Sequence, residues 1–509
     1  YGTSSLLGAI NIVTRIDAKS GATAQLEGGS NGYLAAGGHG NISFQRWRNQ
    51  LSATYLRSDG YQRSKAGSLN SDYRTAKAFY QGQYDDPNVA LRWQAGLSSK
   101  DYGSNTYYSA RFDDQFEHTL KTFLSLKGEN RSGQLHFRPA IYWNHQEDRF
   151  ELIRGSEAKV PYNYHRTEIF GLNLNAYFDW TLGRTAFGAE MRNEDILSTN
   201  LGDPLDRKHA IHGTERFYTN GLNRTNLQLF LEHNIALGPL FVSAGLTAAK
   251  NTQADMDWRV YPGLDVSLRL DSHWQAFANF NTSLRMPSFT ELYYSVGGHK
   301  ADRHLKPEEL SAVEGGLRYT SRAIEAKASV FYNRHRNLID WISDGETDET
   351  GGTLWKSVNF GHIKALGVQA SLQANMRQLL PGQHFFDRFS LGYTWLNQRE
   401  NLPEGIVSQY ALEYLKNKFS AQADFRLLPQ LALRMGYRLQ HRMGSYLDAD
   451  NVRHNYASYG VLDARLQWSE PRWNAYVEGN NLLDKEYRDY GNVAQPGVWV
   501  VAGVAVKIF

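Results

Sequence analysis

Aromatic and amide side chains recur in the long polar stretches of this sequence, where they could bind a large ligand. Aromatic rings offer apolar area with a polar tip, and an amide both donates and accepts hydrogen bonds. We therefore consider six residues as candidate ligand contacts, namely Asn105, Tyr107, Tyr108, Tyr162, Tyr164 and Tyr294. The alternative for each tyrosine is that it braces a loop or belongs to an interfacial aromatic girdle.

Two histidines, His299 and His304, share one polar stretch with Lys300 and Arg303. A neutral imidazole can ligate iron at an open axial position, and the basic neighbours could pair with carboxylates on the same ligand. The alternative is that both histidines are solvated loop residues. This stretch is therefore the candidate site for a haem-like ligand.

Asp113 and Asp114 are adjacent carboxylates that could help to bind calcium in a loop, because hard cations take oxygen ligands. A solvated loop is the alternative, and no cofactor is required by any motif. The sequence contains no nucleophile elbow, zinc-binding helix motif or phosphate-binding loop. We expect a protein that is not an enzyme.

Composition narrows the class of protein. The chain has 509 residues, no Cys, 12 Trp, 30 Tyr and 24 Phe, and a net charge of only +3. Its charges are interspersed, so no basic stripe is available to bind nucleic acid. No window approaches the roughly 18 uninterrupted apolar residues of a membrane helix. Neither a nucleic-acid site nor membrane helices therefore explain the large number of Trp, Tyr and Phe residues.

Apolar and polar residues alternate with period two along most of the chain. Leu431, Leu433 and Leu439 fall on one side of such a run, whereas Arg434 and Arg438 fall on the other. This pattern is typical of strands that have lipid on one face and water on the other. A second run places Ala326 and Val330 toward lipid and Glu325 and Lys327 toward the lumen. A β-propeller would also alternate, but we find no repeat of the roughly 40–50 residues that a blade requires.

The connections between these runs have two lengths. Short turns lie near 85–88, 130–133 and 181–184, among others, and long polar connections lie between them. Short turns on one rim and long loops on the other are typical of outer-membrane barrels. The alternation of the two lengths predicts an all-β fold, a 22-stranded antiparallel transmembrane β-barrel, with ten short turns at the rim nearest residue 16.

Three segments resemble the TonB-dependent outer-membrane receptors. Residues 1–15 (YGTSSLLGAINIVTR) are similar to the last segment of that family's plug domain, with Leu7-Gly8-Ala9 where consecutive glycines are common. The stretch LRMPSFTELY at 284–293, followed by LKPE at 305–308, looks like a loop signature of the family. The stretch NNLLDKEY at 480–487 and the terminal Phe509 look like its C-terminal signature.

The resemblance implies a division into the end of a plug (1–15) and a barrel with long extracellular loops (16–509). It also implies the outer membrane of a Gram-negative bacterium, contact with lipid bilayer and lipopolysaccharide, and energy delivered by TonB. The rest of the plug, the TonB box and any signal peptide are expected upstream of Tyr1.

The loops are similar to those of the vitamin B12 (cobalamin) branch of the family, so the expected ligand is cobalamin or a similar corrinoid. Haem or a ferric siderophore is the alternative ligand. A passive pore or a surface adhesion protein is the alternative of another class, although neither would need a plug. Some receptors of this kind carry a surface lipoprotein lid, which is a further possible partner. We expect no nucleic-acid partner.

Overall fold

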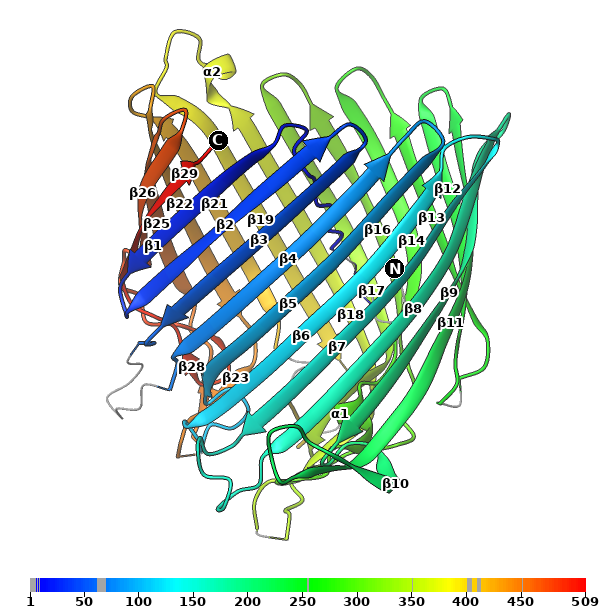
Figure 1. Cartoon of the computed structure of the whole chain (residues 1–509), viewed down its shortest axis with the longest axis vertical. Coiled ribbons are helices and arrows are strands. Elements are labelled where there is room, and N and C mark those ends of the chain that lie inside the picture. The colour runs from blue at the N-terminus through cyan, green and yellow to red at the C-terminus, as the bar shows by residue number, and fades with distance from the viewer. Residues whose placement is uncertain are drawn as a thin grey trace.

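A single closed barrel dominates the computed structural model, which describes residues 6, 8, 10–61, 70–253, 256–349, 351–400, 405–409, 413–450 and 452–509. Its wall has 22 antiparallel strands, as predicted, each hydrogen-bonded to its neighbours along the chain (Figure 1). The first wall strand, β1 (Gly21–Gly29), pairs with the last, β29 (Trp499–Lys507), and this pairing closes the sheet.

The other twenty wall strands follow in chain order. They are β2 (Tyr33–Phe44), β3 (Trp47–Ser58), β4 (Tyr73–Asp85), β5 (Val89–Asn105), β6 (Gln115–Asn130), β7 (Leu135–Glu151), β8 (Asn163–Trp180), β9 (Gly183–Ser198), β11 (Phe217–Leu237), β12 (Leu240–Asn251), β13 (Arg259–Arg269), β14 (Trp274–Arg285), β16 (Glu308–Thr320), β17 (Ile324–Ser343), β18 (Trp355–Asn375), β19 (Phe386–Glu400), β21 (Leu415–Arg426), β22 (Leu431–Arg442), β25 (Tyr459–Ser469) and β26 (Trp473–Asn480).

Shorter elements lie in the connections between wall strands. Most belong to the long loops, namely β10 (Asp203–Ala210), α1 (Phe289–Tyr293), β15 (His299–Lys300), β20 (Val407–Ser408), β23 (Ser445–Leu447), β24 (Arg453–Asn455), β27 (Arg488–Tyr490) and β28 (Val493–Ala494). Helix α2 (Met376–Leu379) lies on the opposite rim. Among the described residues, no helix is long and apolar enough to cross a membrane.

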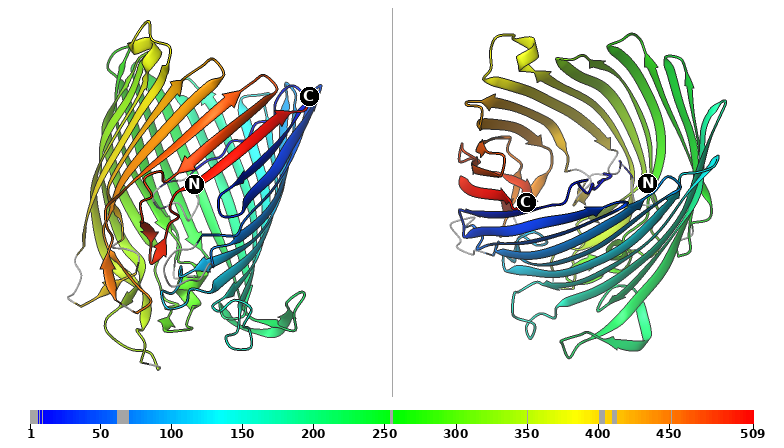
Figure 2. Two further views of the ribbon diagram at one scale, coloured as in Figure 1. Left: turned by 90° about the vertical axis from the view of Figure 1, so that its left-hand side faces the viewer. Right: turned by 45° about the horizontal axis from the view of Figure 1, so that its top comes forward.

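As the connection lengths predict, long loops lie on one rim of the barrel and short turns on the other, with two exceptions (Figure 2). The connection at 30–32 belongs to the long-loop rim but has a tight turn in which Asn31 and Gly32 both have positive φ. The connection at 376–385 belongs to the short-turn rim but contains α2. A four-residue helix is too short to show a helical period, so this turn could not be distinguished from its neighbours by period alone.

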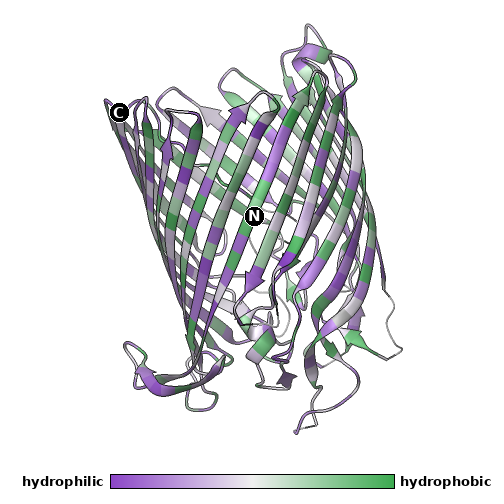
Figure 3. Ribbon diagram, turned by 90° about the vertical axis from the view of Figure 1, so that its right-hand side faces the viewer, coloured by the Kyte–Doolittle hydropathy of each residue, from purple (hydrophilic) through white to green (hydrophobic). Residues whose placement is uncertain are grey.

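The predicted lipid and lumen faces are confirmed by the cross-strand pairs. Lys327 donates to Glu314, which lines the lumen (Nζ to Oε1, 3.2 Å), whereas the neighbouring Val330 is 53% exposed on the outer face. Arg434 donates to Asp424 on the lumen side, and Leu439 is 44% exposed outside. Figure 3 shows the resulting alternation of apolar and polar residues along each strand.

We expect Val330→Arg to lower the free energy of unfolding by about 2–4 kcal/mol, because an arginine near the membrane midplane must be desolvated. Val330 follows the short-turn end of its strand by six residues, which is roughly 14 Å of height in a strand tilted near 45°. Urea unfolding in phospholipid vesicles measures the change. Asn333→Arg is the matched control, since Asn333 lines the aqueous lumen. An equal loss in both variants would contradict the assigned faces.

Candidate functional site

Four aromatic rings form a continuous group at the long-loop mouth of the barrel. The Tyr107 ring stacks on Tyr490 with centroids 4.7 Å apart and meets Tyr108 edge-on at 4.8 Å. Tyr108 in turn meets Phe150 edge-on at 5.0 Å. We call these residues the mouth aromatic group. Tyr107 and Tyr108 remain 46% and 50% exposed, so their rings can still contact a ligand.

The alternation of side chains along β7 indicates that this group faces the lumen. On β7, the outward positions Leu135, Phe137 and Ile141 are exposed, so positions of even number point inward. Phe150 has an even number, so it points inward, where its ring meets Tyr108. The mouth aromatic group therefore lines the entrance to the barrel.

Asn105 does not join this surface. It is 7% exposed, has a positive φ of 51°, and accepts a hydrogen bond from the backbone N–H of Thr106 at its Oδ1 (2.8 Å). Asparagine tolerates the left-handed region because its side chain can bond locally. Asn105 therefore ends β5 and shapes the turn that presents Tyr107.

Tyr162 and Tyr164 brace a loop. Tyr164 is 7% exposed and packs with Leu197, Ile211 and Tyr218, and Tyr162 packs against the same cluster. The hydroxyl of Tyr164 donates to Glu157 at 3.4 Å. The observed contacts of these two tyrosines are therefore those of residues that brace a loop, which was the alternative to ligand binding.

The loop at 286–307 is held to the wall by an arginine between two carboxylates. Helix α1 begins with a capping box in which Ser288 and Glu291 exchange side-chain to backbone hydrogen bonds. Arg285 pairs with Glu291 at 2.9 Å and with Glu308 at 2.6 Å. Glu308 is 3% exposed and also accepts the backbone N–H of Ile339. These bonds fix both ends of the loop.

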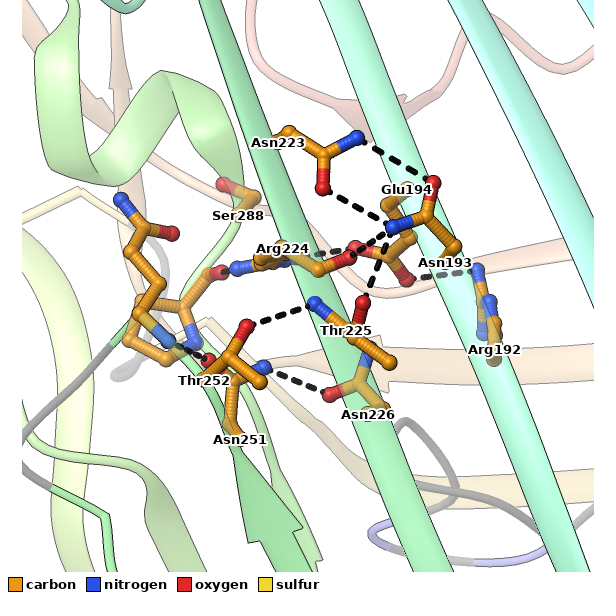
Figure 4. Close-up of polar contacts among 12 residues, drawn as sticks. Arg192, Asn193, Glu194, Asn223, Arg224, Thr225, Asn226, Asn251, Thr252 and Ser288 are labelled. Atoms are coloured by element: carbon orange, nitrogen blue, oxygen red, sulfur yellow. Dashed lines mark hydrogen bonds and ion pairs between the residues drawn. The ribbon is translucent and has the colours of Figure 1, made fainter.

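A second, buried network holds the same loop from the neighbouring wall (Figure 4). Arg224 donates to Glu194 (Nε to Oε2, 2.6 Å) and to the carbonyl of Pro287 (2.7 Å), and its guanidinium lies 4.4 Å from the centre of the Phe289 ring. Glu194 also pairs with Arg192 at 3.0 Å. Removing one partner of a buried ion pair typically costs about 3–5 kcal/mol, so the loop position is strongly determined.

His299 lies inside this loop, packed edge-on between Tyr294 and Trp341. The ring centroids are 5.5 Å and 5.1 Å apart, and Nδ1 lies 3.2 Å from the carbonyl of Gly297. Burial lowers the pKa of His299, so the imidazole is neutral at pH 7. His304 is exposed and lies outside this aromatic cluster. The loop therefore brings Tyr294 to His299 and leaves His304 separate.

Asp113 and Asp114 use their backbone carbonyls to fix the neighbouring loops. The Asp113 carbonyl accepts from Asn70 (3.0 Å) and the Asp114 carbonyl accepts from the N–H of Arg154 (2.9 Å). Burial raises the pKa of Asp114. Within the described part of the chain, no group of three or more His, Asp or Glu residues is placed to hold a metal ion. The calcium site stays a prediction.

Three lysines on the inner wall were missed by the sequence reasoning. Lys77 and Lys121 both lie beside Ser98 in the register of β4, β5 and β6, and Lys100 lies two residues further along β5. The ammonium of Lys100 lies 3.9 Å from the centre of the Tyr102 ring. We call Lys77, Lys100 and Lys121 the inner lysine cluster. The period-two pattern places each of these lysines on the inner face of its strand, but only the register between the strands shows that the three lie close together.

Two acids share this wall and leave it with a net positive charge. Glu117 accepts a hydrogen bond from the Tyr102 hydroxyl (2.5 Å), and Asp148 lies opposite Thr119. None of the three lysines forms an ion pair with a described residue. The wall therefore offers cations below the mouth aromatic group, on strands β4, β5 and β6.

The described part of the 1–15 segment lies inside the lumen. The carbonyl of Leu6 accepts from Ser283 (2.7 Å), and Thr14 accepts from Gln94 (3.0 Å). Ile10 and Ile12 are 93% and 82% exposed there. Such exposed apolar side chains are typical of an interaction surface.

Comparison with known proteins identifies the family to which the chain belongs. The profile described as "TonB dependent receptor-like, beta-barrel" matches residues 22–482. Three solved structures with the same fold are the ferric enterobactin receptor PfeA of Pseudomonas aeruginosa, as a mutant (14% identity, TM-score 0.77, covering 100% of this chain and 83% of PfeA), the FrpB iron transporter of Neisseria meningitidis (14%, 0.76, 97% and 82%) and the copper transporter OprC (14%, 0.73, 96% and 80%).

The profile match spans most of the sequence, and the closed barrel, its unequal rims and its lipid-facing outer wall agree with it. The chain belongs to the TonB-dependent receptor family and folds as the outer-membrane β-barrel that is typical of it.

Proposed function

We propose that this chain is the barrel of a receptor that imports a ferric siderophore across the outer membrane with energy from TonB. The observation that carries the proposal is that the inner lysine cluster lies on the wall below the mouth aromatic group, with β5 running from Lys100 toward the loop that carries Tyr107. Iron chelates of the catecholate type combine negative charge with planar aromatic groups. Cations on the wall below exposed rings fit that chemistry, through charge-assisted hydrogen bonds and ring contacts.

The competing ligands fit this surface less well. A corrinoid carries an amide fringe and no free carboxylates on its ring, so it gains little from three lysines. Of the six residues expected to contact it, Asn105, Tyr162 and Tyr164 make internal contacts. Haem would use the lysines for its two propionates, but it also needs an axial ligand, and His299 is packed between two rings.

The comparisons support the siderophore alternative better than cobalamin. Similar structures include the siderophore receptor PirA and the ferric enterobactin receptor PfeA, and others carry iron or copper transport in their names. At 12–15% identity they share the fold alone, so the ligand must be argued from the residues of this chain.

The proposal includes a plug that closes the lumen. The exposed Ile10 and Ile12 support it, because their side chains would pack against the rest of that domain. TonB would act on the plug rather than on the barrel. A surface lipoprotein lid stays a prediction.

In the intact receptor with its plug, we expect ferric enterobactin, used as the probe, to bind, and we expect cyanocobalamin to give no heat in calorimetry. Tyr107→Ala with Tyr108→Ala should weaken siderophore binding by roughly 30-fold, because two ring contacts are lost. Tyr162→Phe with Tyr164→Phe is the matched control and should leave affinity unchanged. Measurable cyanocobalamin binding would restore the cobalamin assignment.

His299→Ala with His304→Ala tests the haem alternative. We expect siderophore-dependent growth on limiting iron to stay within twofold of wild type, since neither imidazole faces the inner lysine cluster. Growth on haem iron that depends on these two histidines, together with failure to bind ferric siderophores, would show that haem is the ligand.

Replacing Lys77, Lys100 and Lys121 together with Gln should weaken siderophore binding by about 10- to 100-fold, because three favourable charges are removed. The loss should shrink as salt is raised. The triple Lys→Arg variant keeps the charge and should retain most of the affinity. Equal affinity in the Gln and wild-type proteins would indicate a neutral ligand.

A further inference from the structure

A second group of cations lies on the lumen face of β3–β6, near the short-turn rim. Arg48 of β3 and Arg92 of β5 both lie opposite Gln83 of β4, and Lys127 of β6 lies opposite Arg92. Each cation lies among the four residues of its strand that are nearest the short-turn end. We call Arg48, Arg92 and Lys127 the exit cation cluster.

The alternation of each strand directs these side chains into the lumen. The apolar residues exposed on the outer face have odd numbers on β3 and β5 and even numbers on β6, namely Leu51, Tyr55, Leu91, Leu97, Leu124 and Leu126. Arg48 and Arg92 have even numbers and Lys127 has an odd number, so all three point inward. Arg92 and Lys127 are exposed there. The cluster can therefore be reached from within the lumen.

The acids beside the exit cation cluster are already paired with other arginines. Asp85 lies 3.6 Å from Arg92 but only 2.5 Å from Arg131, and Glu129 lies 2.7 Å from Arg138. The other two members of the cluster form no ion pair within the described part of the chain. The cluster therefore keeps positive charge that an anionic ligand can use.

The exit cation cluster shares its strands with the inner lysine cluster. Lys121 and Lys127 are six residues apart on the lumen face of β6, which is about 20 Å along the strand. Between the two clusters lie Gln50, Gln81 and Gln94, which are neighbours in the register of β3, β4 and β5. This wall thus carries cations toward the mouth, neutral amides below them, and cations again toward the short-turn rim.

The inner segment crosses the wall between the two clusters. Gln94 donates to the hydroxyl of Thr14 (3.0 Å), and Gln81 donates to the carbonyl of Arg15 (3.5 Å). Gln81 is only 5% exposed. The segment therefore divides the wall into two separate cationic sites, one on the side of the mouth and one on the side of the short-turn rim.

Acids face the lumen on the side of β11, β13 and β16. Glu232, Asp265 and Glu314 line the large cavity there. Among the described residues, Glu314 pairs with Lys327 (3.2 Å), whereas Glu232 and Asp265 have no cationic partner. An anion in the lumen is therefore repelled by that side and attracted by the wall of β3–β6.

We propose that the exit cation cluster is a second site for the imported anion, which the iron chelate occupies after it leaves the inner lysine cluster and before it enters the periplasm. Two guanidinium groups and one ammonium group can donate charge-assisted hydrogen bonds to an anion with several oxygen atoms. The inference rests on the proposed function, because it requires an anionic cargo. It adds a route, which follows the lumen face of β3–β6.

The test measures the uptake of ferric enterobactin, labelled with radioactive iron, by cells that carry the intact receptor with its plug. We expect Arg48→Gln, Arg92→Gln and Lys127→Gln together to lower the maximum uptake rate by about tenfold, because three favourable charges are lost near the exit. The half-saturating concentration, and the affinity measured by calorimetry, should stay within about twofold of wild type, because binding at the mouth precedes this step.

A charge-retaining variant separates an electrostatic role from a merely structural one. Arg48→Lys, Arg92→Lys and Lys127→Arg together change the shape of every side chain but keep the charge. We expect this variant to import at a rate within about twofold of wild type.

The matched control removes three other cations that face the lumen near the short-turn rim, through Arg269→Gln, Arg318→Gln and Lys507→Gln. All three are exposed, and none forms an ion pair with a described residue. Arg269 and Arg318 follow the acids Asp265 and Glu314 by four residues on their strands, so they lie on the side that repels an anion. We expect this control to import within about twofold of the wild-type rate.

Heat-modified gel mobility verifies folding, and sensitivity of the cells to vancomycin reports whether the plug still closes the lumen. The proposal is overturned if the Gln variant imports at the wild-type rate, if the control variant is slowed equally, or if the charge-retaining variant is as slow as the Gln variant. It is also overturned if the Gln variant becomes sensitive to vancomycin, because the cluster would then hold the plug. Absence of ferric enterobactin binding to the wild-type receptor would contradict the proposed function and this inference together, whereas normal binding with unchanged uptake contradicts this inference alone.

Discussion

The pairing of β1 with β29 is the interaction on which the rest of the structure depends. In hydrocarbon every unpaired backbone N–H and C=O costs several kcal/mol, so a sheet can cross a membrane only if it has no edge. The seven residue pairs between these strands remove the last edge. Once the sheet is closed, successive side chains must point alternately to lipid and to lumen. The candidate binding surface inside the barrel follows from that alternation.

The two faces of the wall carry charged residues in different surroundings. Inside, lysines from three adjacent strands lie on the lumen wall below the exposed tyrosine rings of the mouth. Outside, Arg334, Lys364 and Arg399 stand at the edge of an apolar band. A shift of one residue in register would exchange these faces, so the hydrogen-bonded ladder also fixes where each charge acts.

The sequence was sufficient to predict the barrel and its strand number because period two and turn chemistry are local properties. It could not distinguish Tyr107 from Tyr164, since one is exposed and the other buried only through loop packing. Likewise, Lys77 and Lys121 are 44 residues apart in sequence and become neighbours through cross-strand register. The helix at 376–379 was missed because it occupies a turn. Local patterns thus predict the elements, whereas sites assembled across strands require the fold.

The inner segment has a mechanical consequence. The barrel wall is a continuous ladder of backbone hydrogen bonds, which makes it stiff along its whole circumference. By contrast, the described residues between Leu6 and Thr14 are tied to that wall by single side-chain hydrogen bonds from Ser283 and Gln94. Each is worth about 1 kcal/mol in a lumen where water can replace it. A pulling force applied to this segment would therefore detach it well before the wall deformed, so the barrel can act as a rigid frame around a compliant interior.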